Sequence, residues 1–334
     1  MSEQFETINF QVAETDAGKR LDAFLAENIE GWSRSRLQRL IDNGDVLVNE
    51  KPAKASYKLR NSDEIEVELA EVSAASFEAE NIPLDIVYED EVLAVINKPA
   101  GMVVHPGAGV VNGTLANALA FHFGFRNSDL RFENADDEQS KIQNLKSKIG
   151  LVHRLDKDTS GLIVVAKNET VHEALSEQFQ SREVFKSYVA LVYGVVKQEA
   201  GRIEQPIARD PRNRTRMAIV AGGRGALSLY KIRRSYGSFT LLDVEIKTGR
   251  THQIRVHLSW LKHPIVGDEL YSGGRDNNVQ DVRLRALIRK LDRQFLHAER
   301  LGFRHPETGE QIEFVAPLPV ELTRFLELLE GAEA

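Results

Sequence analysis

The sequence predicts an α+β protein of two domains, and three observations lead to this prediction. Apolar residues recur at helical spacing between residues 18 and 43. From residue 83 onward, apolar runs of strand length alternate with polar loops and a few helical patterns. Residues 71–82 between them are small and acidic without a clear period, which is typical of a linker. We therefore expect a small N-terminal domain over residues 18–70 and a larger domain that begins near residue 83.

The composition excludes several classes of protein. The chain has 334 residues, of which 42% are hydrophobic, and this is ordinary for a globular protein with a buried core. It contains no cysteine, which excludes disulfides, thiolate metal sites and a thiol nucleophile. No apolar run approaches the roughly 20 residues that span a bilayer, and no secretory signal precedes the first domain. We expect a cytoplasmic monomer that does not bind membranes.

Basic charge is concentrated in two parts of a chain whose net charge is −7. Residues 201–257 contain twelve Lys or Arg and four Asp or Glu, and residues 34–60 contain seven against three. Residues 61–97 contain eleven acidic residues and no basic one. Basic surfaces separated in this way are suited to contacts with phosphate groups.

The N-terminal domain combines two short helices with strands. Leu21, Phe24, Leu25 and Ile29 have helical spacing, and a second helix follows Ser33, a plausible N-cap. In that second helix Leu37, Leu40 and Ile41 form the apolar stripe, and Arg34, Arg36 and Arg39 lie off it.

These residues resemble an S-four-type RNA-binding domain. The resemblance is carried by Arg20-Leu21-Asp22, by residues 33–41 and by residues 44–49. It implies that Arg34, Arg36 and Arg39 contact RNA.

The most informative stretch of the second domain is residues 150–167. Two short apolar runs, Leu151–Val152 and Leu162–Ala166, enclose a charged loop. Catalytic residues are often found on loops held by strands. In this loop Asp156 stands between Arg154 and Lys157, which favour its ionised form.

Other chemistries lack a necessary residue or spacing. His252 and His257 do not have the spacing of a zinc-binding helix. Ser160-Gly161 is only half of a hydrolase elbow, and Asp156 with Asp158 is too small a set for a two-metal site. An RNA methyltransferase of the uracil type would need the missing cysteine. What remains is Asp156 among arginines, with Tyr188 on a nearby strand and the basic segment 247–257.

Several motifs in the second domain resemble the RluA/RluD-type family of RNA pseudouridine synthases. They are residues 97–101 with 105–107, 153–161, 186–188 with Gly194, 248–255, 263–271 and 296–303. The resemblance extends over residues 83–326 and implies a catalytic domain with a mixed, mainly antiparallel β-sheet. The stretches 126–148 and 275–293 are longer than the family core needs.

The resemblance also implies roles for single residues. Asp156 is the catalytic carboxylate, either as a nucleophile at C1′ of the ribose or as a base at C2′. Tyr188 stacks on the uracil and assists proton removal, and Arg255 pairs with Asp156. Arg154 fills the space left by the flipped uridine, and His105 and Arg250 contact the RNA. No metal or cofactor is implied.

The expected substrate is RNA, and the combination of domains favours large-subunit (23S) ribosomal RNA or the pre-large ribosomal subunit. Two alternatives remain open. One is a non-catalytic RNA-binding or ribosome-assembly factor, and the other is a family member that acts on tRNA.

Overall fold

The computed structural model describes residues 5–29, 34–43, 46–49, 51–70, 77–106, 110, 112–125, 149–213 and 216–333. They form two compact units, one within residues 5–78 and the other over residues 79–125 and 149–333. Most of the expected linker, residues 71–76, and the stretch 126–148 lie outside the described residues. The backbone N–H of Glu80 donates to the carbonyl of Asn117 at 3.0 Å, so the end of that linker joins the second unit. The domain limits themselves stay predictions.

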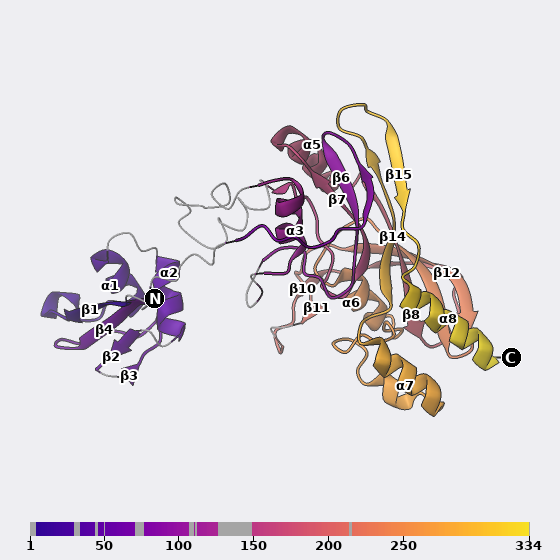
Figure 1. Cartoon of the computed structure of the whole chain (residues 1–334). Coiled ribbons are helices and arrows are strands. Elements are labelled where there is room, and N and C mark those ends of the chain that lie inside the picture. Colours follow the sequence, from indigo (N-terminus) through magenta and orange to yellow (C-terminus); the bar gives the residue numbers. More distant parts are fainter. Residues whose placement is uncertain are drawn as a thin grey trace. The chain divides into compact units, whose positions relative to one another are not determined.

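The first unit packs two helices against a four-stranded antiparallel sheet (Figure 1). The core comes from the apolar stripes of both helices, where Leu21, Leu25 and Leu37 are completely buried. This confirms the expected helices, although Ser33 and Gly44 next to them lie outside the described residues. The elements are β1 (Phe5–Gln11), a short 3-10 helix (Glu14–Asp16), α1 (Leu21–Asn28), α2 (Arg34–Asn43), β2 (Val46–Val48), β3 (Lys51–Pro52) and β4 (Glu64–Ala70), with sheet order β1-β4-β2-β3.

The second unit is built on a nine-stranded sheet in which only β7 and β14 pair in parallel. This confirms the expected mixed, mainly antiparallel sheet. Its order is β5-β6-β7-β14-β8-β13-β12-β9, and β15 pairs with β14. The strands are β5 (Ile86–Glu89), β6 (Leu93–Lys98), β7 (Ser160–Ala166), β8 (Phe185–Tyr193), β9 (Ala200–Glu204), β12 (Leu227–Tyr236), β13 (Phe239–Ile246), β14 (Leu296–Arg304) and β15 (Gln311–Val315). Two short strands, β10 (Ile207–Arg209) and β11 (Met217–Ile219), form a separate hairpin.

Helices border this sheet (Figure 1). They are α3 (Leu115–His122), α5 (Glu169–Gln180), α6 (Gln253–Trp260), a 3-10 helix (Arg275–Asn278), α7 (Val282–Leu291) and α8 (Val320–Glu333). Residues 247–257 read from the sequence as a basic segment, but the structure forms α6 there and buries the first six residues of this helix. Within the described part of the chain, none of the helices has the length and apolar character needed to cross a membrane.

The centre of the sheet positions the candidate site. Every residue of β7 is buried, and so is every residue of β8 after Phe185. Strand β14 lies between these two strands and forms hydrogen bonds with both. The loop that precedes β7 therefore enters a fully buried strand at the centre of the sheet, which restricts the positions that its side chains can reach.

Candidate active site

Asp156 lies in the loop that leads into β7. The backbone N–H of Thr159 donates to the Asp156 carbonyl at 3.1 Å and closes a turn. The strand then passes very near β14, because a Cβ at Gly161, whose φ is +115°, would lie 2.3 Å from the carbonyl oxygen of Ala298. Glycine is the residue that tolerates both this φ and this approach. The Asp156 carboxylate is thus held at the edge of the core, with 18% of its side chain exposed.

Arg255 joins Asp156 to a second carboxylate. Its Nη1 donates to Oδ2 of Asp156 at 3.1 Å. Its Nε and Nη2 donate to the two carboxylate oxygens of Asp268, at 2.7 and 2.9 Å. This fork leaves the guanidinium little freedom. Burial lowers the pKa of Arg255, but the charges of Asp268 and Asp156 outweigh it and the pKa is raised above its ordinary value.

Asp268 itself is completely buried and fully engaged. Besides Arg255, it accepts hydrogen bonds from the backbone N–H groups of Leu270 and Tyr271, each at 3.1 Å. The Tyr271 ring also lies 5.0 Å from the Arg255 guanidinium, in cation–π contact. Asp268 falls within one of the motifs, residues 263–271, but is not among the predicted site residues. In the sequence, the feature that could have pointed to Asp268 is an acidic residue that directly follows an apolar pair and a glycine.

Tyr188 lies on β8, two strands away from β7, with 7% of its surface exposed. Burial raises the pKa of its phenol, and the negative charge of Asp156 raises it further. The phenol is therefore neutral at physiological pH and close enough to feel the Asp156 charge. The structure thus brings together Asp156, Arg255 and Tyr188, three of the residues that the sequence singles out.

Lys98 is a second residue of this region to which the sequence analysis assigned no role. It ends β6 without exposed surface, and its Nζ donates to the carbonyls of Pro99, Met102 and Lys157 at 2.7, 2.9 and 3.1 Å. One ammonium group thus ties the loop after β6 to the loop that carries Asp156. Burial lowers its pKa to about 7, and Arg293 adds to this effect.

His252 is the nearest histidine to Asp156. Its Nε2 lies 4.0 Å from Oδ2 of Asp156, and its Nδ1 is 2.8 Å from the hydroxyl of Tyr271. Burial lowers the pKa of His252, while the charge of Asp156 opposes this. The imidazole is therefore mainly neutral at pH 7 and contributes polarity rather than charge beside the carboxylate.

The other predicted RNA contacts lie on different elements of the two units. Arg154 is exposed on the same loop, and His105 is half-buried. Nε of Arg250 donates to the carbonyl of Gly225 at 3.3 Å. Arg34 belongs to the first unit, where its Nη2 lies 3.0 Å from Oδ2 of Asp22. The side chains of Arg36 and Arg39 lie outside the described part of the structure.

No group of three or more His, Cys, Asp or Glu side chains suited to a metal ion occurs among the described residues. The chemistry that this arrangement supports is that of one ionisable carboxylate, oriented by a fixed guanidinium and bordered by an aromatic phenol. Such a set can form or break a covalent bond at an electrophilic carbon, or remove a proton from it.

Comparison with known proteins identifies the class. The family model described as RNA pseudouridylate synthase matches residues 92–260, and the model of the S4 domain matches residues 19–65. The chain belongs to the RNA pseudouridine synthases, which are isomerases.

Its relatives place it more narrowly within that family. It is 41% identical over 325 residues to ribosomal large subunit pseudouridine synthase D of Xanthomonas campestris, covering 97% of this chain and 92% of that protein. It is 39% identical over 331 residues to the protein of the same name from Vibrio parahaemolyticus, covering 98% of this chain and 96% of the relative. Among solved structures, human RNA pseudouridylate synthase domain containing 4 is similar, with a TM-score of 0.55 and 27% identity, over 73% of this chain and 92% of the human one.

Proposed function

We propose that this enzyme converts uridine to pseudouridine in ribosomal RNA of the large subunit, most directly 23S RNA, and that Asp156 is the catalytic carboxylate. Two relatives that match nearly the whole chain are named for the large ribosomal subunit. The observation that carries the assignment of Asp156 is its contact with Arg255, at 3.1 Å between Oδ2 and Nη1.

The reaction rearranges one nucleotide without adding or removing atoms. The bond between N1 of the uracil and C1′ of the ribose breaks, the base turns, and C5 bonds to C1′. The proton on C5 leaves and N1 gains one, so atoms and electrons balance. In this proposal Asp156 acts at the ribose, either as the nucleophile at C1′ or as the base at C2′.

The surroundings of Asp156 support this role. Arg255 binds Oδ2, and among the described residues no hydrogen bond reaches Oδ1. In this proposal Oδ1 acts on the ribose while Arg255 holds Oδ2 in place. The charged fork of Arg255 keeps the carboxylate oriented through the reaction.

Tyr188 supports the later step, in which the proton leaves C5 of the uracil. Its raised pKa keeps the phenol neutral, and a neutral aromatic ring can stack on uracil. Arg154, exposed on the Asp156 loop, is suited to occupy the space left by a flipped uridine. Arg34 with Arg36 and Arg39 in the S4 domain, and His105 with Arg250 in the second unit, are the proposed RNA contacts.

Release of tritium tests this proposal, because C5 loses its hydrogen during the reaction. Large-subunit ribosomal RNA and tRNA, both transcribed with [5-³H]uridine, are incubated with the purified enzyme. We expect tritium release from the ribosomal RNA and none from tRNA. Release only from tRNA would overturn the substrate, and release from neither RNA would favour an assembly factor that binds RNA without modifying it.

A further inference from the structure

Helix α7 (Val282–Leu291) presents a basic face that the proposed chemistry does not use. Its sequence, VRLRALIRKL, contains no acidic residue. Ile288 is buried, and the three leucines lie on the same arc of the helix at 100° per residue. The opposite arc holds the four basic side chains, Arg283, Arg285, Arg289 and Lys290.

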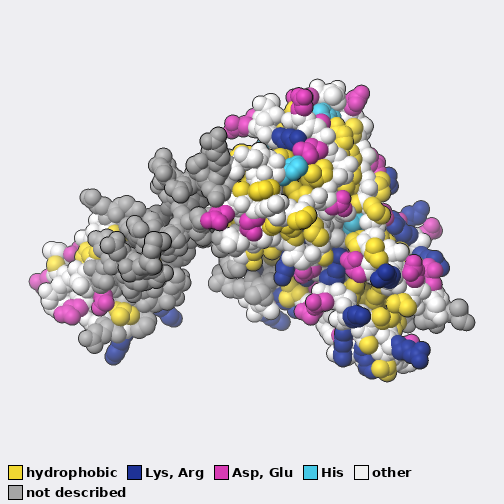
Figure 2. Space-filling view, viewed as in Figure 1, with side chains coloured by type: hydrophobic (Ala, Val, Ile, Leu, Met, Phe, Trp, Pro, Cys, Tyr) yellow, Lys and Arg dark blue, Asp and Glu magenta, His cyan; other side chains and the backbone are white. Residues whose placement is uncertain are grey.

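Three of these four cations form no ion pair among the residues that the structure describes. Arg289 pairs with Asp276, at 3.3 Å between Nε and Oδ2. Within the part of the chain that the structure describes, no ion pair involves Arg283, Arg285 or Lys290. Lys and Arg side chains gather over the lower part of the second unit in Figure 2, where Figure 1 places α7.

Arginines on the sheet of the same unit are arranged differently. Arg202 pairs with Glu204, Arg234 with Glu330, and Arg300 with Glu313. Arg233 pairs with both Asp243 and Glu299. These four sheet arginines are neutralised, whereas three cations of α7 form no ion pair among the described residues, which leaves positive charge on this helix for an anionic partner.

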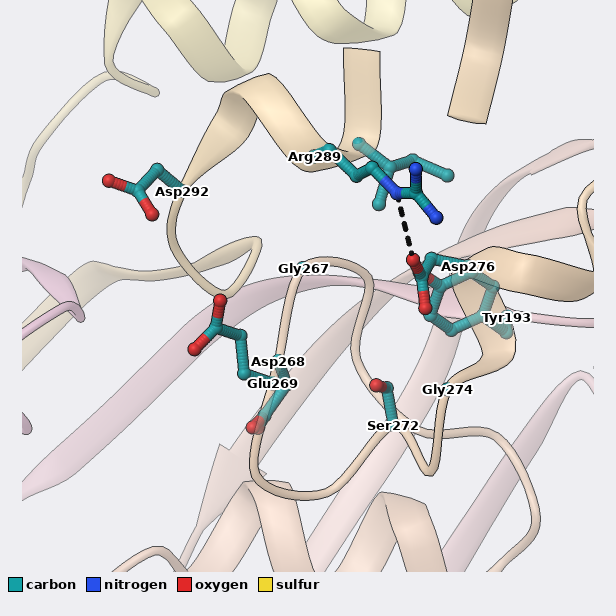
Figure 3. A pocket seen from close by; sticks show the side chains of 10 residues that line it. Tyr193, Gly267, Asp268, Glu269, Ser272, Gly274, Asp276, Arg289 and Asp292 are labelled. Carbon is teal, nitrogen blue, oxygen red and sulfur yellow. Dashed lines mark hydrogen bonds and ion pairs between the residues drawn. The ribbon is translucent and has the colours of Figure 1, made fainter. Parts of the chain in front are cut away.

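The chain on both sides of α7 contacts the frame of the active site. Before the helix, Asp268 holds Arg255. Asp268 also lines a cavity of about 330 Å³ together with Ile288, Arg289 and Asp292 (Figure 3). After the helix, Nη2 of Arg293 donates to the hydroxyl of Ser160 at 2.8 Å, where β7 begins. The helix therefore packs beside the loop of Asp268, the residue that holds Arg255, and is followed by a residue that contacts the start of β7.

We propose that the exposed face of α7 binds the phosphate backbone of the substrate RNA beside the target uridine. Phosphates spaced along an RNA strand complement a row of cations that lacks acidic partners. This inference rests on the proposed function, since it takes RNA as the ligand of the neighbouring site. It adds a binding surface in the second unit that is independent of the S4 domain.

The test is the salt dependence of RNA binding by the full-length protein. The double variant Arg283→Gln/Lys290→Gln removes two exposed unpaired charges. Its affinity for transcribed large-subunit ribosomal RNA is measured by filter binding between about 50 and 200 mM salt. Each phosphate contact contributes about 0.7 to 0.9 to the slope of log K against log salt, so the slope should decrease by about 1.5. We expect Kd at about 150 mM salt to rise about tenfold.

Two controls distinguish the loss of positive charge on α7 from a loss of positive charge elsewhere on the second unit. Arg202→Gln/Lys231→Gln removes two exposed cations from strands β9 and β12 and should leave the slope unchanged. Arg283→Lys/Lys290→Arg preserves both charges and should bind as the parent protein does. An unchanged slope for the glutamine variant of α7, or an equal loss in the β9–β12 control, would overturn the proposal. If the parent protein binds the RNA but releases no tritium, the proposed function fails, while the slopes still decide whether α7 binds RNA.

Discussion

Asp22 in the first unit and Asp156 in the second are both carboxylates that bind arginine. The side chain of Asp22 has no exposed surface, and both of its oxygens accept hydrogen bonds from Arg20, at 3.0 Å each. Its Oδ2 also accepts from Arg34 at 3.0 Å and from Gln38 at 2.6 Å. Asp156 is 18% exposed, and one guanidinium binds one of its oxygens.

The difference separates a structural carboxylate from one that is available for chemistry. The hydrogen bonds to Asp22 hold its pKa well below the usual range, with Arg20 as the largest cause. A carboxylate saturated in this way has no site left for a ligand, and it fixes the arginines that surround it. Asp156 is instead oriented by Arg255, whose guanidinium is itself held by Asp268.

The largest expected effect is that of Asp156→Asn. We expect the single-turnover rate on ribosomal RNA to fall by about 10³-fold or more, because the amide can act neither as nucleophile nor as base. The midpoint of thermal unfolding and the Kd for RNA should remain near the parent values, since the side chain is partly exposed and Arg255 keeps Asp268. Asp22→Asn, measured in parallel, should retain the rate at saturating RNA. Equal loss of rate in both variants would remove the distinction between the two carboxylates.

Asp268→Asn should have the next largest effect. It leaves the buried guanidinium of Arg255 with one anionic partner in place of two, at a cost of about 3–5 kcal/mol in the free energy of unfolding. Misplacement of Arg255 should lower kcat by about 10²-fold. Chemical denaturation and single-turnover kinetics measure the two quantities. Asp276→Asn, which breaks the exposed pair with Arg289, is the matched control and should change stability by no more than about 1 kcal/mol. If both variants behave alike, Asp268 does not position Arg255.

Asp22→Asn should act on binding rather than chemistry. Release of Arg20 and Arg34 should raise KM for RNA about tenfold, which corresponds to about 1.4 kcal/mol, and leave kcat unchanged.

The pH dependence of the first unit supplies a second readout for Asp22. Because its folded pKa is lowered, its contribution to stability is present above the unfolded pKa of about 3.9 and is lost as the pH falls below that value. Hydrogen exchange in the first unit between about pH 3 and 6 should show this loss in the parent and less of it in the variant. The same pH profile in both proteins would contradict the role of Asp22.

The sequence predicts much of this architecture, and the reasons are local. Helices α1 and α2 follow the apolar stripes that the spacing of leucine, phenylalanine and isoleucine predicts there. The contact of Arg255 with Asp156 was expected through the resemblance, and the structure brings the two side chains together.

Other features depend on contacts that no local pattern records. Asp268 contacts Arg255 only because a loop folds it back onto α6. Lys98 donates a hydrogen bond to a carbonyl 59 residues away along the chain. The parallel pairing of β7 with β14 likewise joins segments separated by more than a hundred residues. Helix α6 was missed because its buried residues include Arg255 and His257, so its buried side does not show the apolar spacing that predicts a helix.

A further expected effect concerns Lys98, which should give stability a pH dependence. Its folded pKa is lowered to about 7, while the unfolded lysine binds its proton up to about pH 10.4. The unfolded state therefore holds more protons between these values, so stability should increase with pH by up to about 1.4 kcal/mol per unit. Unfolding by urea at about pH 7, 8 and 9 measures this slope. Lys98→Met should flatten it, whereas equal slopes in both proteins would show that Lys98 keeps its proton.

The central claim is that Asp156 carries out the isomerisation in ribosomal RNA. The most direct measurement is pseudouridine mapping of total RNA from cells that lack the gene and carry either the parent allele or Asp156→Asn. The mapping uses chemical adducts that stop reverse transcription. We predict stops at one or more positions in large-subunit ribosomal RNA with the parent allele, and their absence with Asp156→Asn expressed at the same level. Stops of normal strength in cells that carry only the Asn allele would contradict the account.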